Sequence, residues 1–208
     1  MPETRPTITA MVTYGPDTAL LVVDVQNDFA DPKGSLSVRG AEPIIPTIND
    51  AIRGAEAAGS PVIYTQDWHP PATPHFQKDG GLWPVHCVQG TWGAEFHPDL
   101  LVLPDALIVR KGSGGEDGYS AFSVRDPISG DVQRTRLGEL LHERGIERVV
   151  IAGLATDYCV KESGLDAIRL GFQPTVLTGA VRAVDLHAGD GERALEALEG
   201  AGAQLVEG

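Results

Sequence analysis

The chain has 208 residues, of which 42% are hydrophobic and 22% are charged, as in an ordinary globular protein. Its net charge of −13 argues against nucleic-acid binding, which needs a basic surface. No stretch offers the roughly 18 consecutive apolar residues of a membrane span, and two cysteines cannot form a disulfide framework. We therefore expect a cytoplasmic protein with one domain over residues 18–208, preceded by a flexible polar arm over residues 1–17 without a signal-peptide core.

Short apolar runs rich in Val and Ile alternate with segments of helical spacing. In chain order the predicted strands are 19–25, 61–67, 106–111, 148–154, 174–180 and 203–207. The predicted helices, each ending in glycine, are 44–59, 135–145, 156–171 and 191–202. Because the apolar runs are continuous, the strands are expected to be buried on both faces of a parallel sheet. The pattern predicts a doubly wound α/β fold with helices on both faces.

Two long segments, 68–104 and 112–133, interrupt this order. Structureless loops of this length inside a compact domain are usually either functional or disordered. The first is rich in Pro, His and Trp, which is poor material for disorder. We therefore expect it to serve the function of the protein.

Reactive side chains follow the predicted strands at the edge where an open parallel sheet binds ligands. Asp24 ends the first strand, Lys111 ends the third, and Cys159 lies in the first turn of the helix after the fourth. The start of a helix stabilises negative charge, lowers a thiol pKa and offers N–H groups to an oxyanion. Taken singly, the carboxylate could brace a loop, the lysine could be solvated and the thiol could be packing. Their convergence favours a base, a cation and a nucleophile.

A second group of reactive residues begins where the second strand ends. Its members are one carboxylate and three imidazoles: Asp67, His69, His75 and His86. This donor set suits Zn, Fe, Mn or Ni better than Ca or Mg. The spacing matches no zinc-finger pattern, and the alternative is a loop of exposed or hydrogen-bonded histidines. The nearby Cys87 and His97 are interpreted as structural.

Six motifs in order along most of the chain resemble the nicotinamidase/pyrazinamidase branch of the isochorismatase-like cysteine hydrolases. They are LLVVDVQNDF, DWHPPATPHF, WPVHCVQGTWGAEFHPDL, VRKG, DGYSAF and GLATDYCVKESGLDA. The resemblance implies hydrolysis of nicotinamide to nicotinate and ammonia in NAD salvage, usually with activity on pyrazinamide. It also implies a six-stranded sheet of order 3-2-1-4-5-6, with its switch point between Asp24 and Cys159.

The resemblance also assigns roles to the residues at the sheet edge. Asp24 corresponds to the base that takes the thiol proton and later delivers it to ammonia, and Lys111 to the cation that holds this carboxylate. Cys159 corresponds to the nucleophile that forms a thioester. The N–H groups of Ala155 and Cys159 correspond to the oxyanion hole, with a cis peptide between Leu154 and Ala155.

The same resemblance implies one divalent metal ion, most often zinc, that orients the ring nitrogen of the substrate. Its ligands correspond to Asp67, His69, His75 and His86, and the aromatic walls of the ring pocket correspond to Phe29, Trp83 and Tyr119. The segment FADPKGSL departs from a more Gly-rich turn at the pocket entrance. Whether the long loop 112–133 belongs to a lid or to a subunit contact is left open, as is a homo-oligomer.

Three alternative functions remain open. An isochorismatase needs no cysteine nucleophile, so Cys159 argues against it. A carbamoyl or ureido amidase keeps the triad of Asp24, Lys111 and Cys159. It does not need the histidine loop, the segment that carries His69, His75 and His86. A non-catalytic ligand-binding protein on the same scaffold has no reason to keep all three reactive residues at strand ends.

Overall fold

The computed structural model describes residues 12–208, so the part of the predicted arm over residues 1–11 lies outside the described residues. Val12 and Tyr14 pack against the hydrophobic core. The Gly15 amide donates to the Ser60 hydroxyl at 2.9 Å, and this hydroxyl donates back to the Gly15 carbonyl at 2.7 Å. These contacts hold the chain in place just before the first strand.

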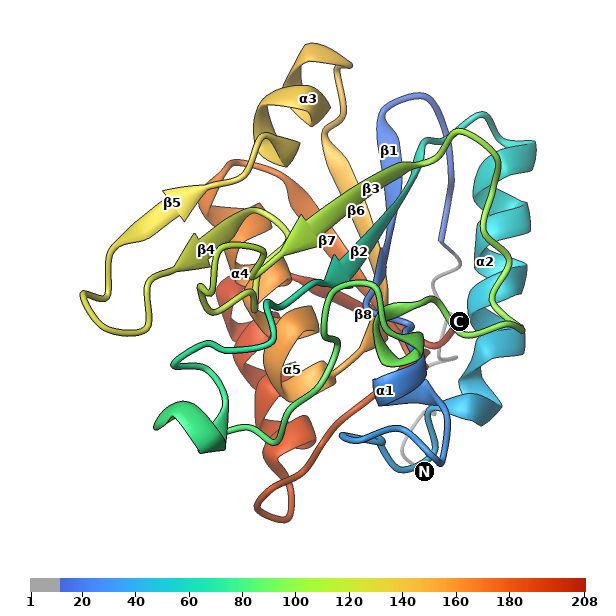
Figure 1. The fold of residues 1–208 in the computed structure, drawn as a ribbon. Helices are drawn as coiled ribbons and strands as arrows, with labels where there is room; N and C mark the ends of the chain where they lie inside the picture. Colours follow the sequence, from blue (N-terminus) through green and yellow to red (C-terminus); the bar gives the residue numbers. More distant parts are fainter. Residues whose placement is uncertain (1–11) are drawn as a thin grey trace, which may run out of the picture.

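Six parallel strands form the central sheet (Figure 1). They are β1 (Thr18–Val23), β2 (Val62–Asp67), β3 (Leu107–Lys111), β6 (Arg148–Leu154), β7 (Gln173–Arg182) and β8 (Gln204–Val206). Their spatial order is β3-β2-β1-β6-β7-β8, which confirms the order 3-2-1-4-5-6 expected for the sheet. Each strand ends within about two residues of its predicted bounds, because uninterrupted apolar runs mark buried parallel strands well.

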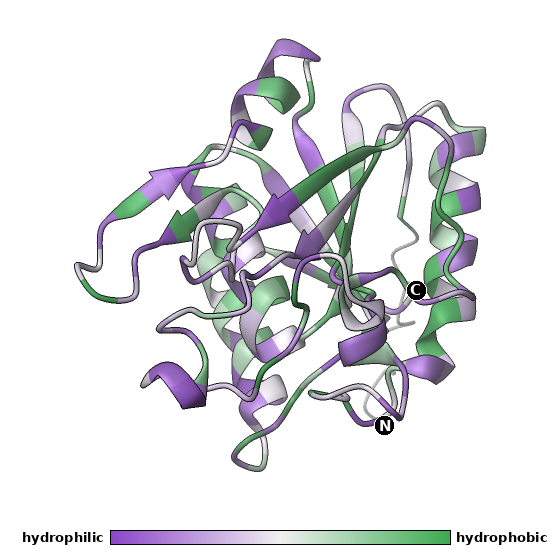
Figure 2. Ribbon diagram, viewed as in Figure 1, coloured by the Kyte–Doolittle hydropathy of each residue, from purple (hydrophilic) through white to green (hydrophobic). Residues whose placement is uncertain are grey.

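Helices cover both faces of the sheet, as predicted (Figure 1). They are α1 (Asn27–Ala30), α2 (Ile45–Ala57), α3 (Leu137–Glu143), α4 (Lys161–Arg169) and α5 (Asp190–Ala201). On one face, Leu20 and Val22 of β1 share a core with Ile48 of α2. On the other, Leu21 and Val23 share a core with α3, α4 and α5. Figure 2 shows the hydrophobic colouring concentrated on the central strands between these layers. Within residues 12–208 no helix is long and apolar enough to cross a membrane.

Two predicted segments differ from the structure. The helix expected over 156–171 begins as a π-helical turn, Thr156–Val160, and continues as α4. The segment 112–133, expected to be irregular, contains β4 (Ser123–Arg125) and contributes to β5 (Val132–Arg134), which pair as an antiparallel hairpin. These strands have three residues each and are largely exposed, so they carry no apolar run. Short helical turns also occur at Glu42–Ile44, Gln77–Asp79 and Trp92–Ala94.

The strand register brings the reactive residues to one edge of the sheet. Asp67 of β2 lies opposite Lys111 of β3, and Val23 of β1 lies opposite Gly153 of β6. Asp24 therefore follows its strand at the same level at which β6 gives way to the turn that carries Cys159. The topological switch point lies between β1 and β6, where such sheets bind ligands.

The first prediction concerns the close contact between β1 and β6, which leaves no room for a side chain at Gly153. Gly153 has φ of +114°, and a Cβ there would collide with the backbone of Val23. We expect Gly153→Ala to lower the free energy of unfolding by about 3 kcal/mol or more, because neither backbone can move away. Gly171→Ala is the matched control, since Gly171 also has a positive φ (+88°) but a Cβ there would have no neighbour within 4 Å. Its cost is only that of the left-handed backbone, about 1 kcal/mol, so equal losses in urea denaturation of the two variants would contradict the contact.

Candidate active site

Lys111 occupies the centre of the site, and its side chain is fully buried. Its ammonium group donates to Asp24 Oδ2 at 2.8 Å, to the Gly118 carbonyl at 2.5 Å, and to Asp67 Oδ1. Cys159 Sγ lies 3.9 Å away. Burial lowers the pKa of this amine, but the carboxylates of Asp24 and Asp67 outweigh burial and raise it well above its ordinary value. Lys111 is therefore a charged group with an acceptor for each of its three N–H bonds.

Asp24 is held on both oxygens. Lys111 binds Oδ2, and the Thr65 hydroxyl donates to Oδ1 at 2.6 Å while accepting from the Asp24 amide at 3.1 Å. Burial raises the pKa of the Asp24 carboxyl, and the lysine charge opposes this rise only in part. A fixed carboxylate with a raised pKa is suited to accept a proton from a neighbouring group.

Cys159 lies in the π-helical turn after β6 and is buried. Its sulfur and carboxylate oxygens of Asp24 and Asp67 lie within 4.8 Å of one another. Burial raises the pKa of the Cys159 thiol well above its ordinary value, and the Lys111 charge offsets this only in part. The lowered thiol pKa expected from a helix start is therefore wrong for the protein without substrate. A thiol with a raised pKa needs a base to become a nucleophile, and Asp24 is placed to supply one.

Asp67 connects the lysine to the histidine loop. Its Oδ1 accepts from Lys111, and its Oδ2 lies 3.7 Å from His69 Nε2 and 3.9 Å from His86 Nε2. Burial acts to raise the pKa of Asp67, but Lys111 and then His69 outweigh it, so the pKa falls below its ordinary value. Asp67 thus remains an anion that faces both groups.

The three predicted histidines converge: ring nitrogens of His69, His75 and His86 lie within 4.8 Å of one another. His69 is fully buried, and neither of its ring nitrogens has a hydrogen-bond partner among residues 12–208. The other two rings use Nδ1 elsewhere, His75 with Asp117 Oδ1 at 2.6 Å and His86 with the Pro84 carbonyl at 2.8 Å. Their Nε2 atoms are left for a further partner.

This donor set fits a metal ion. An orphaned buried imidazole is costly, and a metal would satisfy it. Burial lowers the pKa of His86 to about 4, so the ring is neutral near pH 7, the form that binds metals. Cys87 and His97 stand apart from this cluster. Cys87 is buried in the core, and His97 faces Asp99 and Glu42.

An aromatic pocket opens onto both reactive groups. It contains the three predicted wall residues Phe29, Trp83 and Tyr119 together with Tyr158. Trp83 Nε1 donates to the Tyr119 hydroxyl at 2.8 Å, and the Trp83 and Tyr158 rings meet edge-on at 4.8 Å. The remaining lining comes from both reactive groups and from the pocket rim: Leu36, Asp67, His75, His86, Ala155, Cys159 and Val184. The Leu154–Ala155 peptide is cis, as expected.

Four residues that support the site were not singled out from the sequence: Gln26, Thr65, Asp117 and Tyr158. Gln26 accepts from the Asp67 amide at 2.8 Å and donates to the Asp67 carbonyl at 2.8 Å. Gln26 could have been identified from the sequence, because it lies two residues after Asp24 in the motif VDVQNDF. Asp117 stands just before Tyr119 in DGYSAF, and Tyr158 precedes the nucleophile.

Comparison with known proteins places the chain in a family. The protein-family model described as the isochorismatase domain matches residues 18–208. The chain belongs to the isochorismatase family. This confirms the resemblance drawn from the six motifs and the fold class that it implied.

Relatives within the isochorismatase family match over nearly the whole chain. The nicotinamidase of Escherichia coli is 38% identical over 91% of this chain and 94% of its own. The pyrazinamidase of Pyrococcus horikoshii, whose structure contains zinc, is 39% identical, with a TM-score of 0.82 over 93% of this chain and 100% of its own. PnC1 from L. infantum, whose structure contains nicotinate, is 34% identical, with a TM-score of 0.85 over 95% and 96% of the two chains.

The second prediction concerns the buried ammonium group of Lys111. Lys111→Met leaves two buried carboxyls without their counter-charge, so we expect the free energy of unfolding near pH 7 to fall by about 3–5 kcal/mol. In this variant the lysine charge no longer opposes burial, so the pKa of each carboxyl is higher than in the wild type. A raised carboxyl pKa favours the fold at low pH, and this contribution is lost as the pH rises. The deficit against wild type should therefore be smaller near about pH 5 than near about pH 8.

The measurement is urea denaturation at both pH values in the presence of a chelator. Arg148→Met is the control, because Arg148 pairs with Asp17 at 2.7 Å on the surface. It should change stability little at either pH, since exposed ion pairs contribute little. A pH-independent deficit in Lys111→Met would contradict the role of Lys111 as the counter-charge of Asp24 and Asp67.

Proposed function

We propose that the protein is a nicotinamidase that hydrolyses nicotinamide to nicotinate and ammonia, with pyrazinamide as a second substrate. The observation that carries this proposal is the placement of Cys159, with Asp24 and Lys111 behind it, in an aromatic pocket that also exposes metal-binding imidazoles. The relatives support it, since they include a nicotinamidase, a pyrazinamidase and a nicotinate complex. A flat nitrogen heterocycle that carries an amide matches these features.

The pocket walls and the metal site have separate tasks in this proposal. Phe29, Trp83, Tyr119 and Tyr158 offer ring faces and edges to a flat aromatic substrate. Asp67, His69, His75 and His86 would hold the metal ion, and zinc is favoured because these are its usual donors and because the pyrazinamidase of Pyrococcus horikoshii contains it. When bound, the ion supplies a Lewis acid for the ring nitrogen, which orients the amide.

The first half of the reaction transfers the acyl group to the enzyme. Asp24 takes the thiol proton from Cys159, and the sulfur attacks the amide carbon to form a carbon–sulfur bond. The amide N–H groups of Ala155 and Cys159 hold the oxyanion that forms. As the carbon–nitrogen bond breaks, the proton on Asp24 passes to the departing nitrogen, so ammonia leaves as a neutral molecule.

The second half restores the enzyme. Asp24, again a carboxylate, takes a proton from a water molecule that attacks the thioester carbon. The carbon–sulfur bond then breaks, and the sulfur regains a proton from Asp24. Nicotinic acid leaves and ionises to nicotinate, its proton passing to the released ammonia or to water. Lys111 keeps its charge throughout and limits the movement of the carboxylate between its two proton transfers. We further propose that the reaction serves NAD salvage in the cytoplasm, a setting that suits the two free cysteines.

The third prediction tests the nucleophile. Cys159→Ala should reduce ammonia release from nicotinamide by about four orders of magnitude or more, because the sulfur that forms the acyl-enzyme is gone. Cys87→Ala is the matched control, since this buried thiol lies outside the pocket and should leave turnover nearly unchanged. Ammonia release near the wild-type rate from Cys159→Ala would contradict the mechanism. No release by folded, metal-loaded wild type, with release from carbamoyl or ureido substrates, would identify a sister amidase instead.

The fourth prediction tests the histidine loop. Removal of the metal with a chelator should raise KM for nicotinamide and lower kcat/KM, because the ring loses the partner that orients it. Adding back zinc should restore both values. Metal content is measured on the same samples by elemental analysis. Unchanged kinetics in a sample shown to be free of metal would rule out the proposed role of the ion.

A further inference from the structure

Asp117 contacts one of the three clustered imidazoles. Its Oδ1 lies 2.6 Å from His75 Nδ1, and His75 is buried. We propose that Asp117 is a positioning residue that fixes His75 in the orientation and tautomer that bind the metal. This inference rests on the proposed metal site.

The contact determines which nitrogen of His75 is available. A carboxylate accepts hydrogen bonds, so Nδ1 carries the proton and donates it to Asp117, and the lone pair of Nε2 is free. The ring also stacks on His69, with centroids 4.6 Å apart and planes 20° apart. Such carboxylate–histidine contacts fix ring orientation and raise the basicity of the metal-binding nitrogen. Without the carboxylate, the stacked ring would lose the group that fixes its orientation and its proton.

The backbone holds Asp117 in place through the β4–β5 hairpin. Its amide donates to the Arg125 carbonyl at 2.7 Å, and the Arg125 amide donates back to the Asp117 carbonyl at 3.0 Å. A second link joins the segment before Asp117 to the histidine loop, since the Thr73 hydroxyl donates to the Gly115 carbonyl at 2.7 Å and accepts from the His75 amide at 3.2 Å. These bonds thus fix both the carboxylate and the loop that carries the imidazole.

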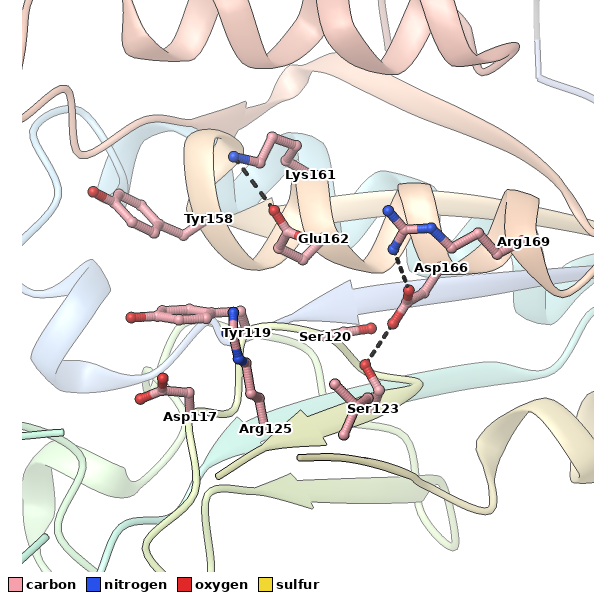
Figure 3. A pocket seen from close by; sticks show the side chains of 11 residues that line it. Asp117, Tyr119, Ser120, Ser123, Arg125, Tyr158, Lys161, Glu162, Asp166 and Arg169 are labelled. Atoms are coloured by element: carbon pink, nitrogen blue, oxygen red, sulfur yellow. Dashed lines mark hydrogen bonds and ion pairs between the residues drawn. The ribbon is translucent and has the colours of Figure 1, made fainter. Parts of the chain in front are cut away.

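Asp117 also lines a cavity between the hairpin and α4, beside the aromatic pocket. Figure 3 shows its carboxylate next to Tyr119 and Arg125, away from the ion pairs of α4. In that cavity Arg169 pairs with Asp166 at 2.8 Å and Lys161 with Glu162 at 3.4 Å. The charged groups of α4 are therefore satisfied among themselves, whereas the carboxylate of Asp117 pairs with His75.

The fifth prediction concerns metal affinity in the whole protein without substrate. Asp117→Ala should weaken zinc binding by about 10- to 100-fold, the usual effect of removing such an outer partner. Asp117→Asn should weaken it less, because the amide oxygen can still accept from Nδ1. Glu116→Gln is the matched control, since the Glu116 carboxylate bonds the Gly114 amide rather than a ring. Affinities are measured by competition with a chromophoric zinc chelator.

Each outcome decides a separate point. Wild-type affinity in Asp117→Ala would overturn the inference, and hydrogen exchange faster only at residues 123–134 would then show that Asp117 merely braces the hairpin. If Asp117→Ala does not fold, Asp117→Asn carries the test. Wild-type zinc affinity in Asp117→Asn, together with faster hydrogen exchange at residues 123–134, would count against the inference. His75→Ala with wild-type affinity would mean that the metal site itself is wrong. Weakened zinc binding in a protein that does not hydrolyse nicotinamide would support the inference while contradicting the proposed function.

Discussion

The buried ammonium group of Lys111 is the interaction on which the site depends. Two carboxylates lie at the edge of an apolar sheet in a chain of net charge −13, and burial alone would keep them from both being charged. One cation, bonded to Asp24 and Asp67 and 3.9 Å from the Cys159 sulfur, offsets that cost. Such clusters rarely add stability over apolar packing, so their retention is best explained by the chemistry they permit.

Asp67 makes this a single electrostatic unit. One of its oxygens accepts from Lys111, and the other faces the imidazoles of His69 and His86. Asp67 is therefore the side chain between the ammonium group that pairs with Asp24 and the clustered histidines. The fold supplies the required precision through strand register, because Asp67 and Lys111 are paired directly across β2 and β3. Gln26 then fixes Asp67 from the loop after β1 through hydrogen bonds to both of its backbone polar groups. The proposed base, the proposed nucleophile and the proposed metal site thus lie at one edge of the sheet.

Much of this arrangement could be predicted from the sequence because it depends on the order of the strands. Continuous apolar runs located all six strands, and a parallel sheet brings the residues after its strands to one shared edge. The β4–β5 hairpin was missed because its strands are short and exposed, so burial left no pattern in the sequence. The direction of the thiol pKa was wrong because the sequence shows a helix start near Cys159 but not its burial, which dominates. The contact of Asp117 with His75 spans 42 positions of the sequence, and that of Thr65 with Asp24 spans 41. Contacts between side chains so far apart in the sequence leave no periodic pattern by which they could be predicted.

In the proposed mechanism Cys159 carries the acyl group as a thioester, with Lys111 and Asp24 arranged for that step. The most direct measurement is acid quenching of the protein during turnover of nicotinamide, followed by mass spectrometry of the peptides that contain Cys159 and Cys87. We expect a nicotinoyl adduct on Cys159 alone, which accumulates before the steady state and decays when substrate is exhausted. Full turnover with no adduct on Cys159, with the quench shown to preserve a thioester standard, would mean that water attacks the amide directly and that Cys159 is not the nucleophile.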